Sequence, residues 1–169
     1  MRLRKSVTLL LAILLLFTFS QSALAGADPI QWTVNTDTGS GNCTAPFREH
    51  DETSTGAYVL QYATNTYVDC HIQVVGQSYV SGGITQVTFD WSYAITSTNH
   101  SAYIHVYADG LGSGDFELYR EDVRDDYGSA SIDIPSWYTG NVYFVVDAVA
   151  KTGYSTGFSF AEIKNISFN

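Results

Sequence analysis

One short stretch of the chain alternates small apolar residues with aromatic and acidic ones. From residue 102 to residue 109 every second residue is Ala, Ile or Val, and the intervening positions carry Tyr103, His105, Tyr107 and Asp109. A strand with this period points the two sets to opposite sides of a sheet. Aromatic rings stack on the apolar C–H faces of sugars, while carboxylates and imidazoles bond sugar hydroxyls. These four residues are therefore candidate carbohydrate-binding groups.

Two further rings, Trp137 and Tyr138, follow Pro135 in a segment with the composition of a turn. Rings on a turn either cap the core or extend a binding surface, and we include both residues among the candidate ligand-binding groups. The alternative for all of these rings is structural, because β-sandwiches are rich in aromatic residues that pack under loops or against a second molecule. Trp91 falls on the apolar side of its own run and is assigned to the core.

Four carboxylates lie within six residues just before Gly128, and a second oxygen-rich segment spans residues 35–42. Calcium binds clustered oxygen ligands that a turn brings together. Neither segment has the complete pattern of a calcium loop, and solubilising charge is the alternative explanation. The sequence requires no cofactor, and structural calcium is the one candidate. Its candidate ligands in the first segment are Glu121, Asp122, Asp125 and Asp126.

No segment has a catalytic motif in its required context. Residues 153–157, Gly-Tyr-Ser-Thr-Gly, match the Gly-x-Ser-x-Gly pattern of serine hydrolases, but a strand is predicted directly after them where that turn leads into a helix, and the His-x-x-x-His spacing of zinc sites is absent. A glycosidase needs two carboxylates about 5 to 10 Å apart across a cleft. Suitable carboxylates are present without any pair standing out: Asp69, Asp115, Glu117 and Asp147. A non-catalytic binding protein is therefore favoured, and no catalytic residue is assigned.

Residues 1–25 have the composition of a secretory signal peptide. Three basic residues precede the apolar run at 7–19, and a small-residue cleavage site precedes Gly26. The run is shorter than the roughly 20 residues of a membrane-spanning helix, and no comparable run follows it. We therefore expect residues 1–25 to be removed, and residues 26–169 to form one secreted β-sandwich domain that does not span a membrane.

Removal of the signal would leave five Lys and Arg against seventeen Asp and Glu, and so a strongly negative protein. This charge excludes nucleic acid as a partner, because its binding depends on clustered positive charge that neutralises phosphates. Neutral ligands, divalent cations and basic partners remain compatible with the charge.

Cys43 and Cys70 are the only cysteines in the chain. In a secreted protein an even pair of this kind typically forms a disulfide. The pair lacks the close spacing and additional ligands of a metal-thiolate site. We predict a disulfide between the two residues, which would stabilise the fold by about 3 to 4 kcal/mol through restriction of the unfolded chain.

Short alternating runs separated by turn residues make up the remaining sequence, which is typical of an all-β sandwich. Strands are predicted at residues 30–35, 56–63, 66–75, 87–96, 102–109, 116–119, 129–134, 140–150 and 157–168. About nine antiparallel strands in two sheets fit a jelly-roll-like sandwich.

The order of these runs also predicts how they pair. The runs at 56–63 and 66–75 are predicted to form one hairpin, and those at 87–96 and 102–109 a second, central one. The run at 140–150 is apolar on both sides, so we expect it to lie in the middle of a sheet with both faces covered. The polar segments 43–55 and 121–128 are predicted loops.

The closing run, FSFAEIKNISF at residues 158–168, alternates apolar residues with an acidic residue and then with Asn. It resembles the closing strand of jelly-roll carbohydrate-binding modules and galactose-binding-like domains. In many of those domains an acidic residue near this point helps to hold a structural calcium against a loop close to the N-terminus, a role that the resemblance assigns to Glu162. Glu162 and Asn165 stand where those families often place an Asp pair.

Together these observations predict a secreted, non-catalytic, lectin-like module that binds carbohydrate, such as a glycan on a cell surface. The first alternative is an extracellular structural or adhesion protein, in which the aromatic residues at 103–107 pack against another protein chain or against a second copy in a homo-oligomer. The second alternative is a small glycan-active hydrolase.

Overall fold

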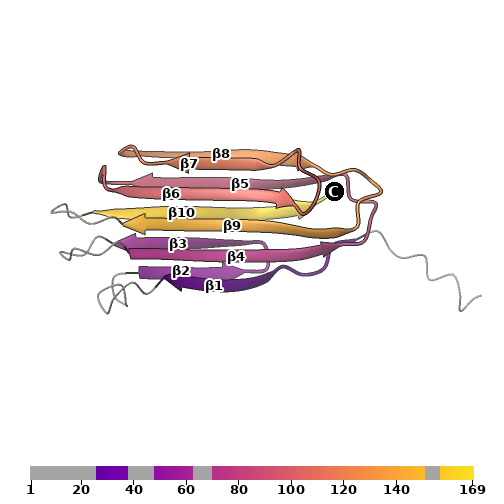
Figure 1. Cartoon of the computed structure of the whole chain (residues 1–169), viewed down its shortest axis with the longest axis horizontal. Coiled ribbons are helices and arrows are strands. Elements are labelled where there is room, and N and C mark those ends of the chain that lie inside the picture. The colour runs from indigo at the N-terminus through magenta and orange to yellow at the C-terminus, as the bar shows by residue number, and fades with distance from the viewer. Residues whose placement is uncertain (1–25, 38–47, 63–69, 151–156) are drawn as a thin grey trace, which may run out of the picture.

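Two β-sheets packed face to face make up the described part of the protein (Figure 1). The computed structural model describes residues 26–37, 48–62, 70–150 and 157–169. Within these ranges ten strands pair in an antiparallel manner, and no helix is long and apolar enough to cross a membrane. The strands are β1 (Gln31–Asp37), β2 (Arg48–Thr53), β3 (Gly56–Tyr62), β4 (Cys70–Val80), β5 (Gln86–Ile95), β6 (His100–Ala108), β7 (Phe116–Arg120), β8 (Arg124–Asp133), β9 (Gly140–Ala150) and β10 (Phe158–Phe168).

The strand order is that of a jelly roll with one strand added to each sheet. Sheet A has the order β1-β4-β9-β6-β7, and sheet B has the order β2-β3-β10-β5-β8. The eight strands from β3 to β10 give the two four-stranded sheets of a jelly roll, and β1 and β2 extend them at the same edge (Figure 1). The predicted all-β, jelly-roll-like sandwich is confirmed, with ten strands among the described residues instead of about nine.

Both predicted hairpins are wrong. β3 pairs with β2 and β10 in sheet B, whereas β4 pairs with β1 and β9 in sheet A. In the same way β5 belongs to sheet B and β6 to sheet A. Alternation identifies the residues of a strand that face the core, but it does not say whether the following turn closes a hairpin or crosses to the other sheet.

Parts of the two predicted polar loops are strands. Residues 48–53 form β2, and residues 124–128 belong to β8. These two strands are the edges of sheet B. Charged residues are common on edge strands because they discourage further pairing with other chains, and this composition made both segments look like loops.

A single core fills the space between the sheets. The predicted position of β9 in the middle of sheet A is confirmed, and its inward residues Val142, Phe144 and Val146 have no exposed surface. Its outward residues Tyr143 and Val145 are only half-buried, so the prediction that both faces are covered fails on that side. Other fully buried side chains come from both sheets and include Val59, Ile72, Val74, Val87, Ile104 and Ile163.

Two tryptophans fill space that glycines on neighbouring strands leave open. A Cβ at Gly76 would lie 2.5 Å from the Trp32 ring, and one at Gly128 would lie 2.8 Å from the Trp91 ring. Trp32 on sheet A also donates from Nε1 to the Thr53 carbonyl of sheet B at 2.7 Å. Trp91 packs partly buried against the core, in agreement with its assignment.

Several sequence predictions concern residues outside the described ranges. The signal peptide at 1–25, Cys43 and Asp69 all lie there. Cys70 begins β4 and is buried. The signal peptide and the disulfide between Cys43 and Cys70 therefore stay predictions.

Candidate ligand-binding face

The rings predicted from the alternation of β6 point away from the core on the outer side of sheet A. Ala102, Ile104 and Val106 are fully buried between the sheets, so the intervening side chains project outward. Strand β6 lies between β9 and β7, and this position places its outward residues inside the sheet face and away from its edge.

Neighbouring strands extend these residues into a continuous series of rings. The aromatic strip, as we name it, consists of Tyr103, His105 and Tyr107 of β6 with Tyr119 of β7 and Tyr143 of β9. Ring centroids are 4.5 Å apart for His105 and Tyr107, and 5.1 Å apart for Tyr107 and Tyr143, both stacked. Tyr103 lies 5.9 Å from His105 and 6.4 Å from Tyr119. The strip therefore crosses three strands.

A row of hydrogen-bonding side chains runs beside the strip across β1, β4 and β9. Asn35 Nδ2 donates to Gln73 Oε1 at 3.4 Å, and Gln73 Nε2 donates to Asp147 Oδ2 at 3.1 Å. His71 Nε2 lies 2.5 Å from the same Asp147 oxygen. Asp147 pairs in register with Tyr103, so the polar row continues directly into the rings.

Tyr103 is held in place by an acid on β7. Its hydroxyl donates to Glu117 Oε1 at 3.0 Å. Burial, followed by the hydrogen bond and the negative charge of Glu117, raises the pKa of Tyr103 to about 12. The phenol is therefore protonated at neutral pH and keeps its hydrogen-bond donor. The Tyr103 ring is thus held in one position, with its hydroxyl and the Glu117 carboxylate at its edge.

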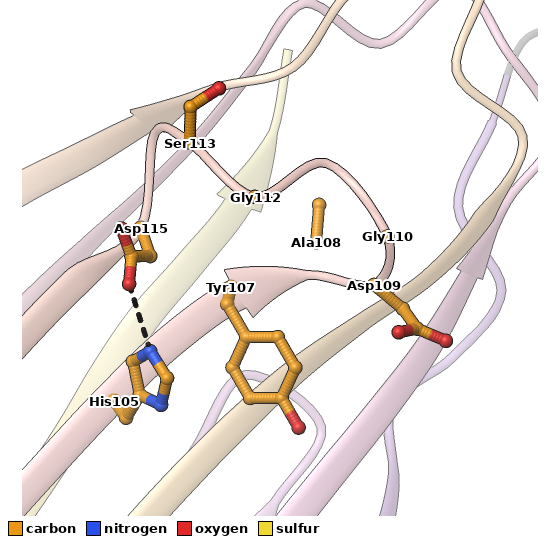
Figure 2. A pocket seen from close by; sticks show the side chains of 8 residues that line it. All are labelled: His105, Tyr107, Ala108, Asp109, Gly110, Gly112, Ser113 and Asp115. Atoms are coloured by element: carbon orange, nitrogen blue, oxygen red, sulfur yellow. Dashed lines mark hydrogen bonds and ion pairs between the residues drawn. The ribbon is translucent and has the colours of Figure 1, made fainter.

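A pocket of about 410 Å³ opens at one end of the strip, beneath the loop that joins β6 to β7. Figure 2 shows the imidazole of His105 and the ring of Tyr107 side by side below this loop. His105 Nε2 lies 3.2 Å from Asp115 Oδ2. The lining residues are His105, Tyr107, Ala108, Asp109, Gly110, Gly112, Ser113 and Asp115.

Glycines and a buried tyrosine shape this loop. Gly110, Gly112 and Gly114 have φ values of 76°, 60° and 82°, a region that favours glycine. The Tyr138 hydroxyl lies 3.0 Å from the Asp109 carbonyl and 2.9 Å from the Asn141 carbonyl, and it donates to both. Tyr138 thereby ties the start of the loop to β9.

The two rings predicted on the 135–140 turn have different surroundings. Trp137 is 75% exposed, whereas Tyr138 is 5% exposed and belongs to the core. Of the two roles considered for Tyr138, capping the core is the one that its burial supports. Neither ring is among those that line the pocket.

The residues predicted to bind calcium are not brought together. Asp125 and Asp126 are consecutive on β8 and therefore point to opposite sides of the strand, while Glu121 and Asp122 precede β8. Glu162 accepts hydrogen bonds from Ser92 and Lys164, both at 2.8 Å, on the outer side of sheet B. Over the described ranges, no group of three or more His, Cys, Asp or Glu is placed to hold a metal ion.

The sequence did not predict that Tyr119, Tyr143, Gln73 and His71 belong to this face. Tyr143 and Asp147 alternate with buried residues in β9, and this alternation was the one sequence signal that they point outward. Their place beside Tyr107 and Tyr103 depends on the register of β6 with β9, which joins residues about forty positions apart. No local pattern determines such a register.

No protein-family model matches the sequence, and no curated protein matches it. Solved structures similar to the chain include a family 61 carbohydrate-binding module in complex with β-1,4-galactotriose, with 11% identity, a TM-score of 0.46, and coverage of 82% of this chain and 87% of that one. A family 4 carbohydrate-binding module has 11% identity, a TM-score of 0.42 and coverage of 82% and 85%. The K1 cleaved adhesin domain of Lys-gingipain from Porphyromonas gingivalis W83 has 12% identity, a TM-score of 0.44 and coverage of 86% and 98%.

Proposed function

We propose that this protein is a secreted, non-catalytic carbohydrate-binding module whose glycan lies along the outer side of sheet A. The observation that carries the proposal is that the aromatic strip and a row of hydrogen-bonding groups lie side by side on one sheet face. Sugars present an apolar C–H face and a rim of hydroxyls, so this arrangement supplies a partner for each.

The groups on this face are oriented before a ligand arrives. Gln73 and His71 hold the carboxylate of Asp147, and Glu117 holds the hydroxyl of Tyr103. Rigid groups lose little conformational freedom when a ligand binds, which preserves more of the interaction free energy as affinity. A carboxylate with one oxygen engaged still has lone pairs for sugar hydroxyls.

Binding is favoured over hydrolysis because the carboxylates of this face already form hydrogen bonds with its own side chains. A glycosidase places an acid and a base or nucleophile on either side of the scissile bond. Asp115, Glu117 and Asp147 each bond a ring or imidazole of the face itself. These bonds support a role for the three carboxylates in positioning the rings.

A glycan array probed with wild-type protein and with the Tyr103→Ala/Tyr107→Ala variant tests this proposal. Removal of two stacking rings at about 1 kcal/mol each should weaken binding to a responsive glycan about tenfold or more. The matched control is Tyr58→Ala/Phe160→Ala, which removes two rings from the outer side of sheet B. Unchanged binding by the first variant would show that the site is elsewhere.

Adhesion to another protein chain is the second candidate function, and the outer side of sheet B favours it. Half-buried Tyr58, Leu60 and Phe160 lie next to one another there through the register of β3 with β10. Apolar side chains on a sheet face suit contact with a protein surface. Light scattering that shows self-association with rising concentration, together with a blank glycan array, would favour this function over carbohydrate binding.

A further inference from the structure

We infer that the pocket beneath the β6–β7 loop receives a positively charged amino group of the glycan, so that the preferred ligand is an amino-sugar polymer. This inference rests on the proposed carbohydrate-binding function and names the chemical class of its ligand. It concerns the end of the aromatic strip at His105 and Tyr107.

The walls of the pocket carry negative charge on two sides. Figure 2 shows the Asp109 carboxylate beside Tyr107 and the Asp115 carboxylate beside His105, with the two rings between them. Asp109 begins the loop and Asp115 ends it, so the loop itself sets their separation. A group that enters over the rings meets a carboxylate on either side.

Basic residues are missing from the same face in the described part of the chain. The outward positions of β1, β4, β9, β6 and β7 carry no Lys or Arg, while they include Asp147 and Glu117. Arg120, the closest basic residue along the chain, pairs with the inward-facing Ala102. An anionic sugar such as a uronic acid or a sulfated sugar would therefore be repelled here.

The form of the pocket suits an ammonium group better than a metal ion. Calcium requires six to eight oxygen ligands at close range, and the described residues hold no cluster of three acidic, His or Cys side chains arranged for a metal. An ammonium has three N–H donors that can reach separate acceptors. The carboxylates of Asp109 and Asp115 supply acceptors on two sides of the pocket.

The loop leaves room for a sugar ring that carries this amine. A Cβ built at Gly110 or Gly112 meets no atom within 4 Å, so the loop is open on that side. Burial, then the neighbouring Tyr143 phenol, and then the carboxylate of Asp109 raise the pKa of the Tyr107 phenol, which keeps its hydroxyl protonated beside the pocket. A sugar unit can stack at the strip while its amine points between the carboxylates.

Calorimetric titration of the protein with a glucosamine tetramer and with its N-acetylated counterpart tests the inference. The pH must keep the amine protonated and the carboxylates ionised. We expect the amine form to bind about tenfold more tightly, since two exposed carboxylates contribute together. Asp109→Asn should lower this preference to about threefold, since Asp115 remains, whereas Tyr103→Ala should weaken both tetramers alike.

Asp51→Asn is the matched control for charge. It also removes one exposed carboxylate, but from β2 of the opposite sheet, at the edge farthest from β7. If it reduced the preference as much as Asp109→Asn, general attraction to an acidic protein would explain the binding, and the inference would be wrong. An oligolysine of equal charge that bound as tightly as the glucosamine tetramer would also overturn it, in favour of a basic protein partner.

The outcomes separate this inference from the proposed function. Equal affinity for both tetramers, or binding only to neutral glycans on the array, would overturn the amino-sugar inference and leave carbohydrate binding standing. Failure to bind any glycan would overturn the proposed function itself.

Discussion

The two outer faces of the sandwich both carry aromatic rings, but the rings have different neighbours. On sheet A, Tyr103 bonds Glu117 and pairs in register with Asp147. On sheet B, Phe160 pairs in register with Leu60 and Ala94, and its ring lies 6.0 Å from that of Tyr58. On sheet A the carboxylates bond the rings and imidazoles of the face, whereas on sheet B Glu162, which is in register with Tyr58, bonds Ser92 and Lys164.

This difference shows why ring content alone does not identify a sugar-binding face. Both faces come from strands with the same two-residue alternation, and both would look aromatic in the sequence. A sugar needs hydroxyl partners within reach of the stacking ring. Those partners come from adjacent strands, as Asp147 does for Tyr103 and Glu162 for Tyr58, so the bonds that each carboxylate already makes distinguish the two faces.

The largest expected change in stability comes from core substitutions, which test whether the two sheets share one core. Phe144 lies under sheet A and Phe89 under sheet B, and both are almost fully buried. We expect Phe144→Ala and Phe89→Ala each to lower the free energy of unfolding by about 3 to 5 kcal/mol, in a single transition in urea, because each leaves a cavity. Two separate transitions would mean that the sheets are not one cooperative unit.

A smaller effect is expected where the core supports the pocket loop. Tyr138→Phe removes a buried hydroxyl that donates to the carbonyls of Asp109 and Asn141. We expect a loss of about 1 to 3 kcal/mol in unfolding free energy and weaker glycan binding, because the Asp109 carbonyl loses this donor and the start of the loop keeps only the bond from the Asp109 N–H to the Asn141 carbonyl. Tyr127→Phe, on an 83% exposed ring of sheet B, is the control and should change stability by less than about 0.5 kcal/mol. Equal effects would argue against a special role for Tyr138.

The loop glycines should give a still smaller effect on stability. Gly112 has a φ of 60° and open space where a Cβ would lie, so Gly112→Ala adds backbone strain without a clash. The expected cost is about 1 kcal/mol by chemical denaturation. Ser113→Ala is the control, because it changes the neighbouring residue at a position whose backbone does not require glycine. A neutral Gly112→Ala would mean that the loop relaxes to another conformation.

The fold could be predicted from the sequence further than the site could. Alternation is a local property, so it correctly identified β6, β9 and β10 as strands and the side of β6 that faces the core. It failed at β2, where charged residues 48–52 suit an exposed edge as well as a loop. It also failed for strand pairing, because a hairpin and a crossing between sheets have similar turn residues.

The candidate site was predictable only in the part that lies on one strand. Tyr103, His105 and Tyr107 share β6, so their common direction follows from the period of that strand. Tyr143 reaches Tyr107, and Tyr119 reaches Tyr103, through pairings with β9 and β7. Packing of the whole sandwich fixes these pairings, and a sequence pattern does not contain that information.

The smallest predicted effect is a pH dependence that belongs to the polar face of sheet A. The pKa of Tyr103 is raised from 10.0 to about 12, first by burial and then by Glu117. Between these two values the unfolded chain loses this proton while the folded protein retains it. The contribution of Tyr103 to stability is therefore fully present below pH 10 and is lost as the pH rises toward 12.

Urea unfolding at a series of pH values, with tyrosinate absorbance recorded in parallel, measures this contribution. We expect Tyr103→Phe to make the fall in unfolding free energy between pH 10 and 12 shallower than in the wild type, because one late-ionising phenol is gone. Glu117→Gln keeps a hydrogen-bond acceptor and removes the charge, so its plot of unfolding free energy against pH should lie between those of the wild type and Tyr103→Phe. Identical slopes for the wild type and Tyr103→Phe would show that Glu117 and burial do not hold the phenol proton, and the contrast between the two faces would then rest on the geometry of the rings alone.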